Sequence, residues 1–214
     1  MTAGADVLDA VIEELYARHT ADASAASAAR RDYEERRGKV HQDDELWEAW
    51  SAAFVEWYVV ERVGATGAPP AVDSYREMRA AADDRADVVR ALVTSQRSLF
   101  EVRVLGRDGR VDLVDLLGGA ELEVHDRRLD GVEVGDVAEL RLVGVRGEVR
   151  FGRTFIYHPK EARPAIVARA RAMLAKGASR RDVVDKIAQL RVQVTRYRHM
   201  PPARVYELGS RIVG

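Results

Sequence analysis

The sequence contains no cysteine among its 214 residues. Disulfide bonds are therefore impossible, and zinc or iron–sulfur sites that are held by cysteine are excluded. No apolar run approaches the ~20 residues that a membrane helix needs. The first residues also lack the basic start and the apolar stretch of a signal peptide. We therefore expect a cytoplasmic protein that makes no membrane contact.

Sequence motifs for catalysis and for metal binding are missing as well. None of the histidines forms a His-x-His or His-Glu-x-x-His pair, and there is no Gly-x-Ser-x-Gly nucleophile elbow. His41 with Asp43 and Asp44 could hold a metal ion, but a polar start to the following helix explains these residues better. We predict no catalytic residue, no metal site and no cofactor, and we expect the protein not to be an enzyme.

The balance of charge changes along the chain, although the net charge of the whole chain is only −1. Residues 1–97 hold 12 Lys and Arg against 19 Asp and Glu, and residues 98–157 hold 9 against 12. Residues 158–214 hold 13 against 4, a net charge of +9. This asymmetry predicts an acidic partner for the basic segment, either another molecule or the acidic part of the same chain.

Helical periodicity dominates the acidic segment, residues 1–97. All three tryptophans lie in the range 43–62, where they share a face with other apolar residues, so we expect this helix to be the centre of a helical core. Asp43 or Asp44 is expected to cap it. Residues 22–37 are expected to form a solvated helix or, alternatively, a linker. The predicted helices span residues 6–19, 22–37, 43–62, 72–82 and 84–95.

Residues 98–157 have the two-residue periodicity of β-strands. Apolar side chains at the even positions from Phe100 to Val104 are expected to face inward and the charged ones between them outward. Asp108-Gly109 and Arg146-Gly147 are turn signals, and Gly152 is expected to mark a bulge. Five short antiparallel strands in this length predict a small, partly closed β-barrel, because closure removes exposed sheet edges. The predicted fold class is therefore α+β.

Residues 158–214 are predicted to form a basic αα-hairpin and a tail, with a turn near Gly177 and a capping box at Ser179. The pattern resembles the start of a helix-turn-helix, although Val184 stands where such motifs carry a small residue. A solvated hairpin, or one packed against the acidic helices, explains the pattern as well and is the favoured alternative. The candidate residues for binding an anionic partner are Arg180, Arg181, Lys186, Arg191 and Arg198.

Three parts of the chain resemble a group of uncharacterised bacterial proteins. They are Phe54-Val-Glu-Trp57-Tyr58, Ser98-Leu-Phe100-Glu-Val102, and Asp115-Leu-Leu-Gly118 with Gly135-Asp136 and Arg141-Leu-Val143. The resemblance covers roughly residues 43–145 and implies a helical region followed by a small β-domain. Members of that group often end in a SEC-C tail, a short cysteine-rich zinc motif. Because this chain has no cysteine, the zinc site cannot be carried over.

These observations favour a non-catalytic interaction or regulatory protein that binds another macromolecule. A protein partner is expected first. Nucleic acid, bound through residues 158–214, is the alternative, because a basic surface attracts phosphates. An enzyme with a site outside the known motifs is the remaining alternative. A deep pocket with converging acidic, histidine and arginine side chains would favour the enzyme, and a shallow surface would favour the binding protein.

Overall fold

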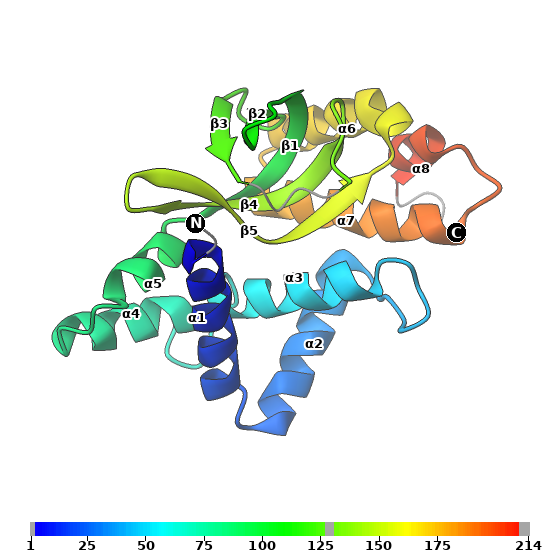
Figure 1. The fold of residues 1–214 in the computed structure, drawn as a ribbon. Helices are drawn as coiled ribbons and strands as arrows, with labels where there is room; N and C mark the ends of the chain where they lie inside the picture. The colour runs from blue at the N-terminus through cyan, green and yellow to red at the C-terminus, as the bar shows by residue number, and fades with distance from the viewer. Residues whose placement is uncertain (1–2, 127–130, 210–214) are drawn as a thin grey trace.

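The computed structural model describes residues 3–126 and 131–209, which form eight α-helices and one five-stranded sheet. Helices α1–α5 and strands β1–β5 come first in the chain, and a 3₁₀ turn at Lys160–Ala162 and helices α6–α8 follow. In Figure 1, α1–α5 lie below the sheet and α6–α8 pack beside it, so the α+β class is confirmed. The helices are α1 (Ala3–His19), α2 (Ala23–Arg37), α3 (Trp47–Val60), α4 (Pro70–Ala80), α5 (Ala86–Val93), α6 (Arg163–Ala175), α7 (Arg180–Arg196) and α8 (Pro202–Leu208). The strands are β1 (Gln96–Leu105), β2 (Arg110–Asp115), β3 (Glu121–His125), β4 (Val137–Val145) and β5 (Glu148–His158).

Residues 22–37, for which the sequence left a helix and a linker as alternatives, contain helix α2. The carboxylate of Asp22 caps its first turn by accepting a hydrogen bond of 2.8 Å from the backbone N–H of Ser24. The helix is less solvated than expected, because Tyr33 and Arg37 are buried. These two side chains pack α2 against the interior, although the helix has a high content of charged residues.

Helix α3 forms the core that its tryptophans predict, but it begins later than expected. Leu46 stands at its N-cap without a side-chain hydrogen bond, so the prediction that Asp43 or Asp44 caps it is wrong. Asp44 instead accepts a hydrogen bond from the backbone N–H of His41, which closes a separate turn before the helix. The aromatic residues of α3 that are buried are Trp50, Phe54, Trp57 and Tyr58.

The sheet is open, with the strand order β3-β2-β1-β4-β5 and antiparallel neighbours throughout. The prediction of a β-barrel is therefore wrong. The sheet curls enough to bring β3 and β5 into contact, and its inner face is filled by side chains of the strands themselves. The edge strand β5 packs against α3 and α1. Helices thus protect an edge that barrel closure would otherwise have protected.

The turns of the sheet follow the predicted glycine signals. Arg146 and Gly147 both have positive φ, of 52° and 82°, as the tight β4–β5 hairpin requires. The pairing of β4 with β5 shifts around Gly152, so the predicted bulge is confirmed. A second irregularity, between Val102 and Val104 of β1, was not expected. It places Val104 at the surface, where 44% of it is exposed, although its spacing predicts an inward side chain.

The αα-hairpin of α6 and α7 is confirmed, including the capping box of Ser179 and Asp182. Helix α7 is buried on two sides. Val183 and Ile187 pack with α6 and α8, whereas Ala188 and Val192 join the core of the N-terminal helices. The basic hairpin therefore packs on the acidic helices, with α7 against α2.

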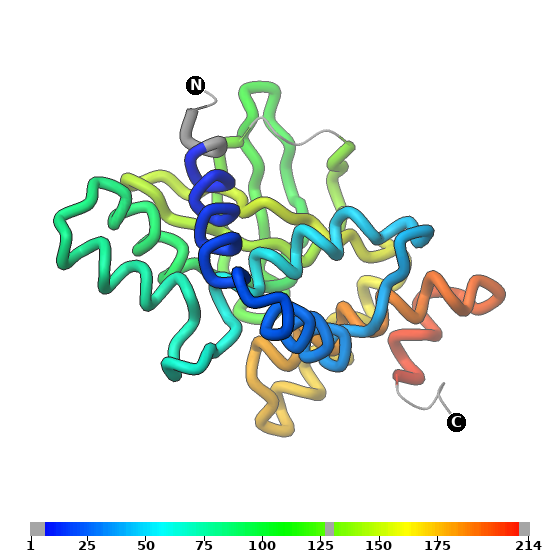
Figure 2. The backbone as a smooth tube through the Cα atoms, turned by 90° about the horizontal axis from the view of Figure 1, so that it is seen from below, coloured from blue at the N-terminus to red at the C-terminus, as the bar shows by residue number. Residues whose placement is uncertain are grey.

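Helix α8 lies in the segment that the sequence pattern predicts only as a tail, so this helix was not expected. Pro202 occupies the first turn of this helix, where its missing N–H leaves no hydrogen bond unmade. Val205 and Tyr206 of this helix are fully buried. Helices α1 and α8 lie at opposite sides of the molecule in both views (Figure 1, Figure 2).

Candidate functional site

Seven charged side chains meet in the interior, where the three segments of the chain join. Their exposed fractions lie between 1% and 9%. We call this group of three arginines and four carboxylates the buried network. It consists of Arg37 from α2, Glu56 from α3, Glu61 directly after α3, Arg97 from β1, Glu139 and Arg141 from β4, and Asp185 from α7.

Arg97 is the centre of the buried network. Its Nε and Nη2 atoms donate to the two carboxylate oxygens of Glu61, both at 2.8 Å. Nη1 donates to Glu139 and Nη2 also donates to Asp185, both at 2.9 Å. The planar guanidinium can meet three carboxylates in this way because its donors form a rigid fork. One side chain thus joins the end of α3, the sheet and α7.

Arg37 makes the second link between α2, the sheet and α7. It donates to Asp185 at 2.9 Å and to both oxygens of Glu139 at 2.8 Å. Its guanidinium carbon also lies 5.1 Å from the ring centres of Tyr33 and Trp50. Contacts of a cation with aromatic faces add stabilisation when the site is dry. Arg37 therefore connects the aromatic core of the helices to the charged interior.

Arg141 joins the network to the bulge of β5. Its Nε donates to Glu56 at 2.7 Å, and its Nη2 donates to Glu61. The other oxygen of Glu56 accepts the backbone N–H of Arg153 at 3.1 Å. A Cβ on Gly152 would lie 2.8 Å from this oxygen and 3.0 Å from the Cβ of Arg141. Glycine at the bulge therefore makes room for the buried Glu56–Arg141 pair.

Ion pairing favours the charged forms of Glu61 and Arg97 in the buried network. Burial by itself would raise the pKa of Glu61, but Arg97 and Arg141 reverse this and hold that pKa well below its usual range. Burial would lower the pKa of Arg97, yet its three carboxylate partners raise it well above its ordinary value. Glu61 therefore stays a carboxylate near neutral pH and is a poor general acid or base there.

A second polar cluster lies at the end of β2. The buried Asp115 accepts hydrogen bonds from the hydroxyl of Ser98 at 2.7 Å and from the backbone N–H of Leu117 at 3.0 Å. Its other oxygen accepts from Nη2 of Arg180 at the start of α7. A Cβ on Gly118 would lie 2.8 Å from both Asp115 and Arg180, so glycine there leaves space for this ion pair.

Two surface hollows adjoin the buried network, and Arg181 lies in both. The first, of about 320 Å³, is lined by four arginines, and we call it the arginine pocket. The second, of about 400 Å³, has both acidic and basic side chains, and we call it the mixed hollow. The arginine pocket is lined by Glu61, Ser95, Gln96, Arg97, Arg141, Arg180 and Arg181. The mixed hollow shares Glu61 and Arg181 and adds Asp32, Glu35, Arg36, Trp57, Arg62, Val63 and Asp185.

Arg181 differs from the other arginines of this region. Its side chain is 67% exposed, and its Nε lies 3.9 Å from Glu61, which is too far for a hydrogen bond. Among the described residues it has no closer ionic partner. It is therefore a cation held near the buried network but directed to solvent, where a second molecule could reach it.

The structure does not gather the predicted anion-binding residues on one free surface. Arg191 is mostly buried and donates to the carbonyl of Tyr157 at 2.7 Å and to Glu45 at 3.0 Å. Lys186 is partly buried and donates to Gln189, while Arg198 is exposed and donates to a carbonyl of its own helix end. Arg180 and Arg181 are the two that share a hollow. The role of all five in binding stays a prediction.

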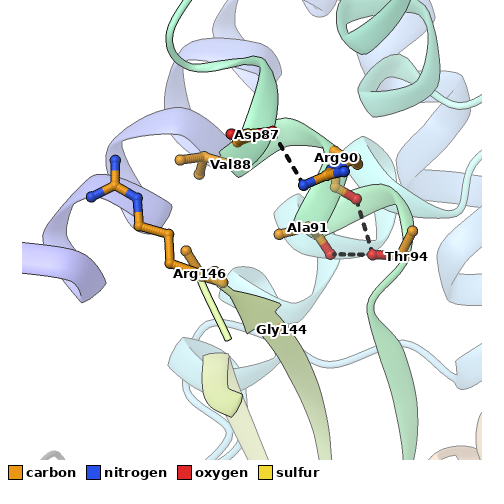
Figure 3. A pocket seen from close by; sticks show the side chains of 8 residues that line it. Asp87, Val88, Arg90, Ala91, Thr94, Gly144 and Arg146 are labelled. Carbon is orange, nitrogen blue, oxygen red and sulfur yellow. Dashed lines mark hydrogen bonds and ion pairs between the residues drawn. The ribbon is translucent and has the colours of Figure 1, made fainter. Parts of the chain in front are cut away.

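A further pocket, of about 310 Å³, lies between α5 and the tip of the β4–β5 hairpin. Figure 3 shows the side chains that line it. Asp87 and Arg90 pair with each other at 3.2 Å, and Thr94 donates to carbonyls of its own helix. The guanidinium of Arg146 lies apart from them (Figure 3). The polar groups here do not converge on one point, so the pocket offers no arrangement for catalysis.

The buried histidine of the chain packs in the C-terminal part. Nδ1 of His158 lies 2.8 Å from the hydroxyl of Tyr206 on α8. Burial, with Arg191 and Arg37 nearby, lowers the pKa of His158 to about 3, so the imidazole is neutral at physiological pH. Another histidine, His19, contacts the hydroxyl of Ser74 at 3.2 Å. Ser74 is fully buried, which makes this pair a structural contact rather than an accessible nucleophile and base.

Within residues 3–126 and 131–209, no group of three or more His, Asp or Glu residues is placed to hold a metal ion. In those residues, too, every helix is too short or too polar to cross a lipid bilayer.

A family model matches residues 6–191, which include every residue of the buried network. The chain belongs to DUF7986, a family of unknown function. No curated protein and no solved structure matches the chain. The relation to proteins with a SEC-C tail, which the sequence motifs suggest, stays a prediction.

The sequence motifs of this DUF7986 chain contain polar residues whose role sequence reasoning missed. Glu56 lies within the Phe54–Tyr58 stretch and Arg141 begins Arg141-Leu-Val143, and both belong to the buried network. Ser98 and Asp115 begin the other two stretches and bond to each other. The apolar residues and glycines of these stretches indicate packing and turns. They also supply buried hydrogen-bonding partners, which packing alone does not require.

Proposed function

We propose that this DUF7986 protein is a non-catalytic interaction protein, which binds another protein through the surface around Arg181. The observation that carries the proposal is the position of Arg181 itself. It is exposed, lacks a hydrogen bond among the described residues and lies in both the arginine pocket and the mixed hollow. Arginine is enriched at the energetic centres of protein interfaces, because its fork of donors gives both strength and orientation.

The surroundings of Arg181 support a protein partner over a small apolar ligand. Acidic residues (Asp32, Glu35) and basic residues (Arg36, Arg62) share the mixed hollow. Val63, which also lines this hollow, is 61% exposed. Charges of both signs with some apolar surface match the polar rim of a protein interface. The sequence-based expectation of a cytoplasmic location accompanies this proposal.

The charge chemistry of the site also favours binding over catalysis. The carboxylate that both hollows share, Glu61, is held in its ionised form by Arg97 and Arg141, so it has no proton to exchange near neutral pH. His158 is neutral but buried. We therefore keep an enzyme as a possible outcome of experiment and not as the proposed function.

Nucleic-acid binding remains the alternative, but through surface contacts with phosphates and not through insertion of α7 into a groove. Insertion of α7 into a DNA groove would require a helix with a free face, whereas α7 packs on two sides. Phosphate contacts from Arg180, Arg181 and Arg198 at the surface are still compatible with the fold. Such binding would weaken steeply as salt rises, because each phosphate contact releases counterions.

The test compares a charge reversal at the proposed surface with the same change elsewhere. Arg181→Glu and Arg107→Glu both remove an exposed arginine, but Arg107 lies in the β1–β2 turn, distant from α7 in sequence and outside both hollows. Proteins from the native cytoplasm are captured on wild type and on both variants, and the bound protein is then titrated against each purified variant. We expect binding to be lost with Arg181→Glu and retained with Arg107→Glu.

Two results would contradict the proposal. One is a partner that binds both variants equally well, because the Arg181 surface would then not be the interface. The other is a shift of mixed DNA or RNA by the wild type at low salt that Arg181→Glu abolishes, without any protein partner that depends on Arg181. That result would make nucleic acid the ligand of this surface.

A further inference from the structure

The arginine pocket is lined by four arginines and one carboxylate. Its single carboxylate, Glu61, is covered on both oxygens: one accepts from Arg97 and Arg141, and the other accepts from Arg97. The other carboxylates that pair with these arginines are not part of the lining. A group that enters the pocket therefore meets the positive side of the ion pairs.

Unused donors remain at the mouth of this pocket. Nη2 of Arg180 donates to Asp115 and Ser98, while its Nε and Nη1 have no hydrogen-bond partner among the described residues. The guanidinium of Arg181 likewise has no hydrogen-bond partner among the described residues. Two adjacent arginines at the start of α7 thus hold several N–H groups that can turn toward one ligand.

We propose that the arginine pocket binds a phosphomonoester group that a protein partner carries on a side chain. This inference rests on the proposed function and names the chemistry of the partner. A phosphomonoester has three terminal oxygens and a charge between −1.5 and −2 near neutral pH, and clusters of arginine bind it through charge-assisted, often bidentate hydrogen bonds. A carboxylate has only two oxygens and one charge, and so satisfies fewer of the free donors.

The mixed hollow explains why the phosphate is expected on a protein segment. It continues from Arg181 and Glu61, which it shares with the arginine pocket, and its other charged residues include both signs. A uniform chain of phosphates would meet the carboxylates of Asp32 and Glu35 there. A peptide can match such a surface with residues of either sign on either side of the phosphorylated one.

The test uses small probes and detects binding from the NMR signals of arginine side chains. The probes are N-acetyl-phosphoserine amide, its unphosphorylated form, inorganic phosphate and a 5′-phosphorylated dinucleotide. We expect the phosphoserine probe to shift the Nε–H signals of Arg180 and Arg181. Arg181→Gln should weaken its binding about tenfold or more, the usual cost of a lost charged hydrogen bond. The matched control Arg107→Gln should bind as the wild type does.

The pH dependence gives a second readout. The second ionisation of a phosphomonoester lies near pH 6, while arginine stays charged throughout. Affinity for the phosphoserine probe should therefore fall severalfold from about pH 7.5 to about pH 5, because the probe loses negative charge. Binding that is equal at both pH values would show that the second charge is not recognised and would overturn the proposal.

The remaining outcomes separate this inference from the proposed function. If no phosphate probe shifts the arginine signals, or if Arg181→Gln binds as tightly as the wild type, the phosphate site does not exist. If the dinucleotide binds much more tightly than the phosphoserine probe, the ligand is nucleic acid and not a protein segment. A protein partner that depends on Arg181 but binds equally after phosphatase treatment would refute the phosphate and leave the proposed function intact.

Discussion

Replacing Arg97 by methionine tests the buried network most directly. Methionine keeps much of the length and the apolar stem, but it removes four hydrogen bonds to three carboxylates. The network would then hold Arg37 and Arg141 against four buried carboxylates. Breaking a buried ion pair costs about 3–5 kcal/mol, because the remaining charge stays desolvated without its partner. Domains of ordinary size are stable by about 5–15 kcal/mol, so the loss is large.

Thermal and urea unfolding measure this loss. For a chain of this size, ~1 kcal/mol corresponds to a change of about 2–4 °C in Tm, so Arg97→Met should lower Tm by roughly 10 °C. Glutamine at position 61 carries no charge, so it does not need the ion pair that Arg97 supplies to Glu61. The double variant Arg97→Met with Glu61→Gln should therefore recover part of the stability that the single variant loses, which a double-mutant cycle detects.

Arg85 supplies a matched control for burial. Like Arg97 it makes four side-chain hydrogen bonds to carboxylates, those of Asp83 and Glu14, but it lies at the surface. Water can replace these partners, so Arg85→Met should change Tm far less. Equal losses for Arg97→Met and Arg85→Met would refute the conclusion that desolvation of the network determines the cost.

Two further changes test other parts of the fold. Gly152→Ala should destabilise the protein by about 1–3 kcal/mol, because its Cβ would press on the Glu56 carboxylate; Gly144→Ala, whose Cβ would meet no atom within 4 Å, should change urea unfolding little. His158 has a pKa of about 3 in the folded protein, against an ordinary value of 6.5. Between pH 6.5 and pH 3 the imidazole therefore binds a proton only in the unfolded state, and stability falls as the pH drops below 6.5. The loss from this group should reach about 2 kcal/mol near pH 5. It should be absent in His158→Gln and retained in His125→Gln, and unfolding curves that leave the pH slope unchanged in His158→Gln would contradict the buried, neutral imidazole.

The order and type of most elements could be predicted from the sequence because local signals agree with the fold. Glycines with positive φ mark the hairpin at Arg146-Gly147 and the end of α6 at Gly177. Ser179 and Asp182 form the capping box that their spacing predicts. These features depend on a few neighbouring residues. They are therefore readable without knowledge of distant contacts.

The candidate site could not be predicted, because it depends on contacts between distant parts of the chain. In β4 the alternation of Glu139 and Arg141 with apolar residues resembles a strand with one solvated face. Both faces are in fact buried, and Arg141 stands directly opposite Arg97 on β1. Two like charges facing each other across strands signal that carboxylates must come from elsewhere. Which carboxylates do so is fixed only when α3 and α7 pack on the sheet.

Contacts between residues that are distant in sequence also explain why the prediction of a barrel failed. Strand periodicity indicates that five strands lie together, but it does not say what covers the last edge. Glu56 accepts the backbone N–H of Arg153, so a helix residue bonds to the β5 bulge. Edge protection by helices and edge protection by closure leave the same pattern in the strands themselves. What distinguishes the two arrangements is a helix residue, Glu56, about a hundred positions before the strand that it contacts.

The geometry of the network predicts different effects of substitutions on stability and on the proposed binding. Arg97 and Arg141 hold Glu61 by short hydrogen bonds, whereas Arg181 approaches it only to 3.9 Å at the surface. A partner that draws Arg181 away from Glu61 therefore removes a weak, solvated contact, while the buried hydrogen bonds remain. Substitutions at Arg181 should change affinity and leave the unfolding curve in place, whereas substitutions at Arg97 should shift the unfolding curve. If Arg181→Gln lowered Tm as much as Arg97→Met does, Arg181 would belong to the structural network, and the surface around it would not be available to a partner.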